Sequence, residues 1–237
     1  MKDLKIGVFA YNFKHMKTQV GIQNLCMAGY KPEVILAADR VDLNFYKSKI
    51  RISPKDMFLW HPKEIADFYD IEYNVTVHNS QKTFDIIKEK NLDVGIILGA
   101  RILKPIAFSA FNLGVINLHP GVLPQNRGLD TIKWAILKGL PQGVTSHLIN
   151  EKIDMGLLID KKEIKVYSDD TLIDVYLRIQ SLEQQMMIES IDKLNKNREL
   201  EVFELLSDGK NYHRSVPLEI EKQLYEQFDN YKKLVGV

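Results

Sequence analysis

Residues 93–118 read DVGIILGARILKPIAFSAFNLGVINL, and two short apolar runs in this stretch decide the fold. The runs at 93–98 and 114–118 are hydrophobic without alternation, as expected for strands that are covered on both faces. Similar runs occur at 4–10 and 34–38, and segments with helical periodicity separate them. Strands that alternate with helices are typical of βαβ units. We therefore predict an α/β fold in which helices flank a mostly parallel sheet.

The second half of the chain is expected to add two strands, a long helix and a small tail. Asp169 or Asp170 should cap the long helix, because an aspartate side chain accepts hydrogen bonds from the first amides of a helix. We expect one domain over residues 1–195 and a small C-terminal extension over 196–237. The expected elements are strands at 143–149 and 157–166, helices at 130–138 and from about 170 to 194, a short strand and a turn at 207–210 in the tail, and a last helix from about 217.

The composition is that of a globular domain. Of the 237 residues, 45% are hydrophobic and 27% are charged, and the formal net charge is +1. This supplies enough apolar surface to offset chain entropy, and it gives no electrostatic footprint for nucleic-acid binding. No stretch approaches the roughly 20 apolar residues that span a bilayer. Residues 1–10 lead into a strand-like run without a signal-peptide pattern, so we expect a cytoplasmic protein without a membrane partner.

The densest block of unusual residues is 117–128, NLHPGVLPQNRG, which begins where a buried strand ends. Ligands of open α/β sheets bind at this carboxyl edge. Asn117 and His119 are two residues apart on a strand, so their side chains point to the same side. Two hydrogen-bonding side chains aimed at one spot suit an oxyanion site. The alternative is structural, with Asn117 capping a turn and His119 satisfied at the sheet edge.

A second feature is the segment 147–156, HLINEKIDMG, in which a strand leads into a tight loop. The loop holds Asp154, and Gly156 follows two residues later. A carboxylate at such a place suits a general base that takes a proton from an amine or orders a water molecule. An ordinary turn aspartate before a glycine is the alternative interpretation.

Together these features resemble the folate-dependent formyltransferase family, which includes glycinamide ribonucleotide, methionyl-tRNA and sugar N-formyltransferases. The resemblance covers residues 75–180 most strongly, and it implies the family's Rossmann-like catalytic domain. It also implies a catalytic triad of Asn117, His119 and Asp154. The matching motifs are Asn117-x-His119-Pro120, Leu123-Pro124, Arg127-Gly128, Trp134-Ala135, Gly143-Val144-Thr145 and Asp154-x-Gly156.

The resemblance implies N10-formyltetrahydrofolate as the formyl donor. A primary amine would attack the formyl carbon, Asn117 and His119 would stabilise the developing oxyanion, and Asp154 would take up the amine proton. No metal is expected, because the six histidines are scattered without the spacing of metal ligands. The resemblance places the donor beside two loops, and the candidate contacts are Arg101, Ile102, Leu103, Ile149, Asn150 and Ile153.

The segment 11–17, YNFKHMK, bears on the identity of the amine. It follows the first strand, where glycinamide ribonucleotide formyltransferases have a glycine-rich phosphate loop, but here it is bulky, aromatic and basic. Aromatic side chains suit packing on a base or sugar, and lysines suit a diphosphate. The candidate substrate contacts are Tyr11, Asn12, Lys14, Lys17, Arg127 and Gly128.

The resemblance is therefore greatest to sugar N-formyltransferases. It implies a nucleotide-linked dideoxy amino sugar as the substrate, with dTDP favoured over UDP or GDP, and a product for a surface polysaccharide such as the O-antigen of lipopolysaccharide. A homodimer is expected. The alternatives are a glycinamide ribonucleotide formyltransferase and a formyltetrahydrofolate hydrolase, and a methionyl-tRNA formyltransferase is disfavoured by the short tail and the near-zero net charge.

Overall fold

The computed structural model describes residues 4–42, 48–197, 202–205 and 211–236. Within them the strands are β1 (Ile6–Tyr11), β2 (Val34–Ala38), β3 (Glu72–Val75), β4 (Val94–Ile97), β5 (Gly114–His119), β6 (Arg127–Gly128), β7 (Gly143–Leu148), β8 (Leu157–Glu163), β9 (Phe203–Glu204) and β10 (Tyr212–His213). The helices are α1 (Met16–Met27), α2 (Pro62–Phe68), α3 (Gln81–Glu89), α4 (Pro105–Phe108), α5 (Thr131–Lys138), α6 (Leu172–Asn197), α7 (Leu218–Glu221) and α8 (Leu224–Val235).

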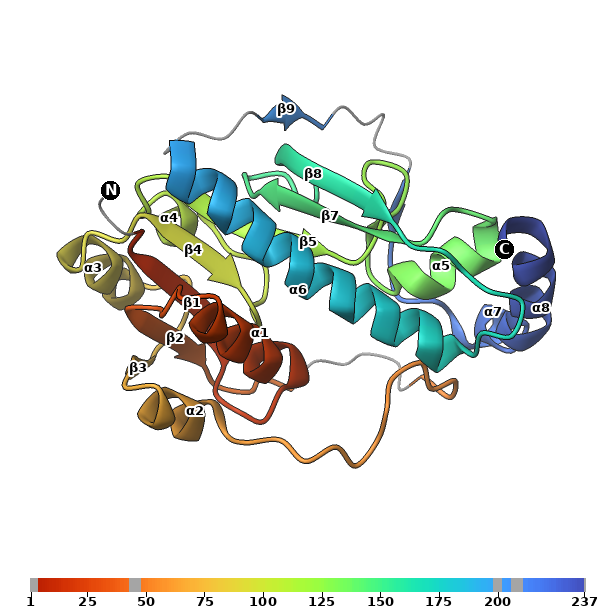
Figure 1. Cartoon of the computed structure of the whole chain (residues 1–237), viewed down its shortest axis with the longest axis horizontal. Coiled ribbons are helices and arrows are strands. Elements are labelled where there is room, and N and C mark those ends of the chain that lie inside the picture. Colours follow the sequence, from red (N-terminus) through yellow and green to blue (C-terminus); the bar gives the residue numbers. More distant parts are fainter. Residues whose placement is uncertain (1–3, 43–47, 198–201, 206–210, 237) are drawn as a thin grey trace.

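The main sheet has the order β3-β2-β1-β4-β5-β7-β8-β9 in the described part of the chain (Figure 1). The first five of these strands are parallel, which confirms the predicted mostly parallel sheet. β7 and β8 continue the sheet in antiparallel pairing, as does β9 at its edge. Chain order reverses between β1 and β4, and such a switch point is where open α/β sheets bind ligands at their carboxyl edge.

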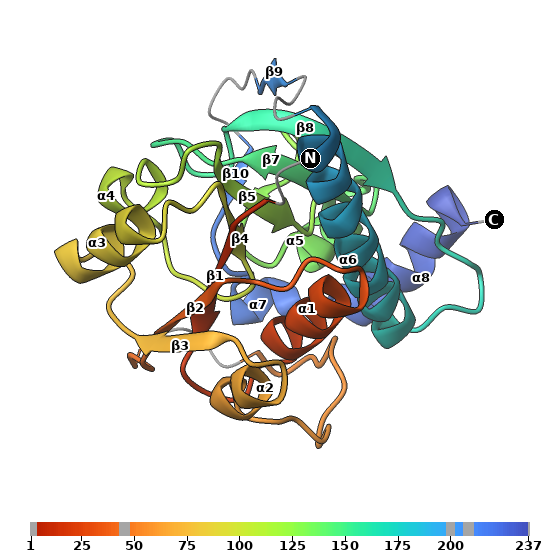
Figure 2. The same ribbon diagram turned by 60° about the vertical axis from the view of Figure 1, so that its left-hand side comes forward.

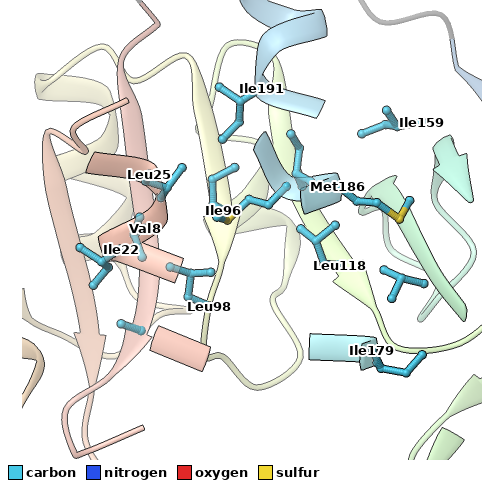
Figure 3. Close-up of a cluster of buried hydrophobic side chains, with 14 of the residues drawn as sticks. Val8, Ile22, Leu25, Ile96, Leu98, Leu118, Ile159, Ile179, Met186 and Ile191 are labelled. Atoms are coloured by element: carbon cyan, nitrogen blue, oxygen red, sulfur yellow. The ribbon is translucent and has the colours of Figure 1, made fainter. Parts of the chain in front are cut away.

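Helices cover both faces of the sheet (Figure 2). α1 and α6 lie on one face, and α3 and α4 lie on the other. Alternate strand residues serve the two layers: Val8 packs in the cluster under α6, whereas the next residue, Phe9, packs in the cluster under α3 and α4. Figure 3 shows Ile96 and Leu118 of the central strands beside Met186 of α6. Burial on both faces explains why these strands read as continuous apolar runs.

The strand expected at 157–166 ends at Glu163, and the helix expected from about 217 is divided into α7 and α8. Two further local details differ from the sequence-based expectations. The long helix is capped by Thr171, because the Thr171 hydroxyl accepts from the Asp174 amide at 3.3 Å and the Asp174 carboxylate accepts from the Thr171 amide at 2.8 Å. Asp170 instead binds Arg178 through both carboxylate oxygens. The second detail is α2, which the sequence did not predict, because its N-cap is His61 rather than a serine, threonine or aspartate.

The described residues that follow α6, 202–205 and 211–236, contact the rest of the chain at several places. β9 adds to the sheet beside β8, and β10 pairs with β6. α8 packs beside α5, and the Tyr231 hydroxyl donates to the Leu140 carbonyl at 2.7 Å. Glu221 of α7 pairs with Lys133 of α5 at 2.6 Å, and both side chains are buried. The turn expected at 207–210 lies outside the described residues.

Candidate active site

The candidate site lies on the face of β5 and β7 that is turned away from α6. Leu118 points into the core under α6, so its neighbours Asn117 and His119 point to the opposite face. In the antiparallel ladder His147 lies opposite Asn117, and Thr145 lies opposite His119. The strand alternation therefore places four polar side chains on one patch of the sheet.

Asn117 is held by His147. The Asn117 Nδ2 atom lies 3.2 Å from His147 Nε2, and because an amide nitrogen only donates, the ring nitrogen accepts. Burial, and then the nearby His119, lower the pKa of His147 to about 4 despite the opposing effect of Asp154. A ring that is neutral near pH 7 can accept at Nε2, so the two observations agree. Among the described residues the second N–H of the Asn117 carboxamide has no further partner, so it can donate to a ligand.

His119 lies between a carbonyl and a carboxylate and is only 4% exposed. Its Nε2 donates to the Asn126 carbonyl at 2.9 Å. Its Nδ1 faces the Asp154 Oδ1 atom at 3.5 Å, which is longer than a direct hydrogen bond. The ring is thus oriented by the backbone on one side and faces the predicted base on the other.

The loop after β5 wraps closely around the His119 ring. A side chain on Gly121 would contact both the Asn126 carbonyl oxygen and the His119 ring. The Thr145 hydroxyl donates to the Gly121 carbonyl at 2.7 Å and accepts from the Leu123 amide at 3.0 Å. These buried hydrogen bonds explain how an irregular loop keeps one shape, as the block of prolines and glycines predicted.

Asp154 completes the cluster. Its backbone is left-handed, with φ 50°, and its Oδ2 atom accepts from the Gly128 amide at 3.0 Å. The carbonyl of the preceding Ile153 accepts from Arg127 at 2.5 Å. A side chain on Gly156 would overlap the Leu148 carbonyl oxygen, so only glycine lets the loop return this close to β7. The structure thus brings the three predicted catalytic residues together.

His147 is the member of the cluster to which no sequence motif assigned a role. Because His147 follows Thr145 by two residues, the two side chains lie on the same face of β7. The pairing of His147 with Asn117, however, depends on the register of β5 and β7. Sequence periodicity does not set the register between two particular strands, so this residue emerges only from the fold.

The residues predicted to line the donor site fall into two groups. Ile102 and Ile153 are 63% and 39% exposed, and they offer apolar surface on two different loops. Arg101 is exposed beside Ile102. Leu103, in contrast, is 7% exposed and packs in the core under α3 and α4. Ile149 packs against that core, and Asn150 caps its own loop by binding the Met155 carbonyl and the Lys152 amide.

The aromatic segment after β1 is well ordered by its own contacts. The Tyr11 ring stacks on Phe13 with centroids 4.8 Å apart, and its hydroxyl donates to the Ala100 carbonyl at 2.9 Å. The Asn12 side chain donates to Asp39 and accepts from Tyr73, so both ends of its carboxamide are already bonded within the protein.

The basic residues predicted to bind substrate are placed differently from one another. Lys14 is exposed. Lys17 instead binds the buried Glu183 carboxylate at 2.7 Å and the Leu118 carbonyl at 3.0 Å, so its charge is matched inside the protein. Arg127 and Gly128 hold the Asp154 loop through the hydrogen bonds described above. The structure therefore gives these three residues internal partners and leaves Lys14 facing solvent.

The described residues offer neither a metal cluster nor a membrane-spanning helix. They contain no group of three or more histidine, cysteine, aspartate or glutamate side chains placed to hold a metal ion. Among the same residues, no helix has both the length and the apolar character needed to cross a membrane.

Comparison with known proteins identifies the family. The family profile described as "Formyl transferase" matches residues 54–191. The chain belongs to the formyl transferase family. Its motif block, Asn117 to Asp154, lies within the matched region.

Several formyl transferases with different names resemble the chain. A methionyl-tRNA formyltransferase of Flavobacterium psychrophilum is 33% identical over 109 residues, which are 46% of this chain and 34% of that protein. The crystal structure of the formyltransferase PseJ from Anoxybacillus kamchatkensis, in complex with UDP-4,6-dideoxy-4-formamido-L-AltNAc and tetrahydrofolate, is 26% identical with a TM-score of 0.54, covering 78% of this chain and 95% of that one. A phosphoribosylglycinamide formyltransferase from Anaplasma phagocytophilum has a TM-score of 0.65 at 17% identity, covering 91% and 100%, and this likeness shows the fold alone.

Proposed function

We propose that this protein transfers a formyl group from N10-formyltetrahydrofolate to the primary amine of a nucleotide-linked dideoxy amino sugar. The observation that carries the proposal is the cluster of Asn117, His119 and Asp154 on one face of the sheet, held by His147 and Gly128. The cluster combines an amide donor, an imidazole and a carboxylate, which suit the oxyanion and proton-transfer steps of amine acylation.

Each of these residues has a part that follows from its contacts. The free N–H of Asn117 would donate to the oxyanion that develops when the amine attacks the formyl carbon. Asp154 would accept the proton that the amine loses, directly or through one water molecule. We assign His119 no part of the oxyanion site that the sequence analysis expected, because its Nε2 already donates to the Asn126 carbonyl. Its Nδ1 faces the Asp154 carboxylate, so His119 would stabilise the transferred proton. His147 keeps the Asn117 carboxamide in place, and its lowered pKa and its Nε2 contact with Asn117 make it a poor proton acceptor near pH 7.

The surroundings fit a flat, partly apolar donor. Ile102 and Ile153 expose apolar side chains, and Arg101 supplies a positive charge for the donor's carboxylates. When bound, N10-formyltetrahydrofolate supplies the formyl group, and the protein supplies orientation and the proton acceptor. The similar PseJ structure contains tetrahydrofolate, which supports this choice of donor.

The amine is assigned from the segment after β1. Tyr11 and Phe13 form a half-buried aromatic pair, and the exposed Lys14 follows them directly. An aromatic surface beside a lysine suits a nucleoside diphosphate, because bases stack on aromatic rings and ammonium groups bind phosphate. The formamido sugar nucleotide in the PseJ complex supports the same class. The product would then be consumed by a sugar transfer that builds a surface polysaccharide such as the O-antigen.

A substrate panel tests this proposal. Purified protein is mixed with N10-formyltetrahydrofolate and, separately, with dTDP-, UDP- and GDP-linked amino sugars, with glycinamide ribonucleotide, or with no amine. Tetrahydrofolate release is followed by absorbance, and the amine product is followed by mass. We expect the mass of one added formyl group on an amino sugar nucleotide. Formylation of glycinamide ribonucleotide alone contradicts the proposed amine, and tetrahydrofolate release at the same rate without any amine indicates a hydrolase.

A further inference from the structure

A small parallel sheet connects the C-terminal extension to the active-site loops. It is formed by β6 and β10. The Arg127 amide donates to the Asn211 carbonyl at 3.1 Å, and the Leu129 amide donates to the His213 carbonyl at 2.9 Å. We call residues 211–216 the C-terminal strap. These residues lie far beyond Asp154 in the sequence, yet only the strand β6 separates them from Asp154 in space.

The pairing determines where the Gly128 amide points. Successive N–H groups of a strand point to opposite sides. The amides of Arg127 and Leu129 point to the strap, so the amide between them, that of Gly128, points away from it. Asp154 lies on that side, and its Oδ2 atom accepts from the Gly128 amide at 3.0 Å. The strap therefore sets the direction of a hydrogen bond to the predicted base without touching it.

Side chains of the loop before α5 and of α5 itself anchor the strap. The Asp130 carboxylate accepts from the Val216 amide at 3.0 Å. The Trp134 indole N–H donates to the Arg214 carbonyl at 2.7 Å, and its ring stacks on His213 with centroids 4.9 Å apart. The strap is thus bound to one short stretch of the catalytic domain by side-chain and backbone contacts together.

The approach of the strap requires glycine at position 128. Gly128 has φ +94°, a conformation that other residues rarely adopt, and a side chain there would overlap the His213 carbonyl oxygen. The backbone of β6 therefore lies in direct contact with the strap. A loop with a free edge would leave the Gly128 amide able to turn away from Asp154.

We propose that the C-terminal strap is a positioning element for catalysis, which acts through β6 to hold the Asp154 carboxylate against His119. The proposal rests on the proposed function for the role of Asp154 as proton acceptor. The geometry itself does not depend on which amine is formylated. Asp154 stays the residue that exchanges the proton, and the strap only orients it.

A strap variant with a matched control tests the proposal. In the full chain, Asp130→Gly combined with Trp134→Phe removes both side-chain anchors. Glycine tolerates the left-handed backbone at position 130, and phenylalanine keeps an aromatic ring at position 134. Asp130→Asn alone keeps the acceptor and is the control. We expect kcat for formyl transfer to fall about tenfold in the double variant, with KM for donor and amine within about twofold, because a misplaced catalytic group lowers turnover.

A double-mutant cycle separates positioning from general structural damage. In the Asp154→Asn background the same strap substitutions should lower kcat by less than about twofold, because the carboxylate that the strap positions is already gone. Equal losses in both backgrounds overturn the proposal. The proposal is also overturned if the double variant loses thermal stability and active protein in proportion to its loss of activity, because the strap is then a structural element only.

A second readout does not require activity. Amide hydrogen exchange by NMR should show the Gly128 N–H protected in the wild type and in Asp130→Asn, and at least about tenfold less protected in the double variant. Unchanged protection in the double variant overturns the proposal whatever the activity. If the wild type formylates no amine in the panel, the proposed function fails, and the Gly128 exchange rates still decide whether the strap orders this hydrogen bond.

Discussion

Acidification from pH 7 to pH 4.5 should destabilise the folded protein by about 2 kcal/mol through the buried site around His147. Burial, and then the neighbouring His119, lower the pKa of this ring to about 4, whereas an unfolded histidine titrates near 6.5. Between these values the unfolded chain binds a proton that the folded protein does not. Stability therefore falls as the pH falls from about 6.5 to about 4, and this contribution is constant below that range.

The magnitude follows from the two pKa values. The whole shift corresponds to about 3 kcal/mol at 1.36 kcal/mol for each pH unit. Most of that difference, about 2 kcal/mol, develops between pH 7 and pH 4.5. Protonation would also place a ring N–H opposite the Asn117 amide N–H, so the hydrogen bond that holds this carboxamide would be lost. Against a total stability of about 5–15 kcal/mol, the effect is large enough to measure.

Urea unfolding of the wild type and of His147→Gln at both pH values measures this contribution. Glutamine keeps an acceptor for Asn117 but does not titrate, so the variant should lose about 2 kcal/mol less than the wild type on acidification. Titrating groups away from this site, including His15, whose pKa burial also lowers to about 4, contribute equally to both proteins and cancel. His119 and Asp154 interact electrostatically with His147, so the difference between the two proteins measures His147 together with these two neighbours. Losses that agree within about 0.5 kcal/mol would refute a buried, neutral His147.

Three further predictions concern catalysis, substrate binding and stability. Asn117→Ala should lower kcat by about 10² in steady-state formyl transfer with little change in melting temperature, and near-normal turnover would remove this residue from the oxyanion site. Lys14→Ala should raise KM for the nucleotide sugar several-fold, whereas Lys17→Ala should leave that KM unchanged because Lys17 pairs with Glu183; equal effects would contradict the placement of these two lysines. Lys133→Met should cost about 3–5 kcal/mol in urea unfolding, because it leaves the buried Glu221 carboxylate without its ion pair, and a cost below about 1 kcal/mol would contradict the burial of this pair.

Much of the fold follows from local pattern. The apolar runs at 93–98 and 114–118 are β4 and β5, because a strand that is buried on both faces is apolar at every position. Part of the candidate active site can also be predicted from the sequence, because Asn117 and His119 lie on the same face of their strand whichever strand pairs with it. The residue that caps the long helix was harder to predict from the sequence, since Asp170, Thr171 and Asp174 all have side chains that cap helices.

The contacts that could not be predicted from the sequence depend on pairing between distant segments of the chain. His147 meets Asn117 through the register of two antiparallel strands, and Lys17 meets Glu183 across 166 positions of sequence. Both contacts are set by tertiary packing, which a local window does not contain. The role of Gly128 is of the same kind. Its partner is fixed by the strap, and the strap comes from the far end of the chain.

The most direct test of the central claim is amine-dependent formyl transfer measured with the wild type and with Asp154→Asn. Both proteins are supplied with N10-formyltetrahydrofolate and a nucleotide-linked amino sugar, and the formylated product is quantified by mass. We predict product from the wild type only when the amine is present, and a loss of about 10² or more in kcat for the variant. Equal turnover by both proteins, or tetrahydrofolate release that is independent of the amine, would contradict the assignment of Asp154 as the acceptor of the amine proton.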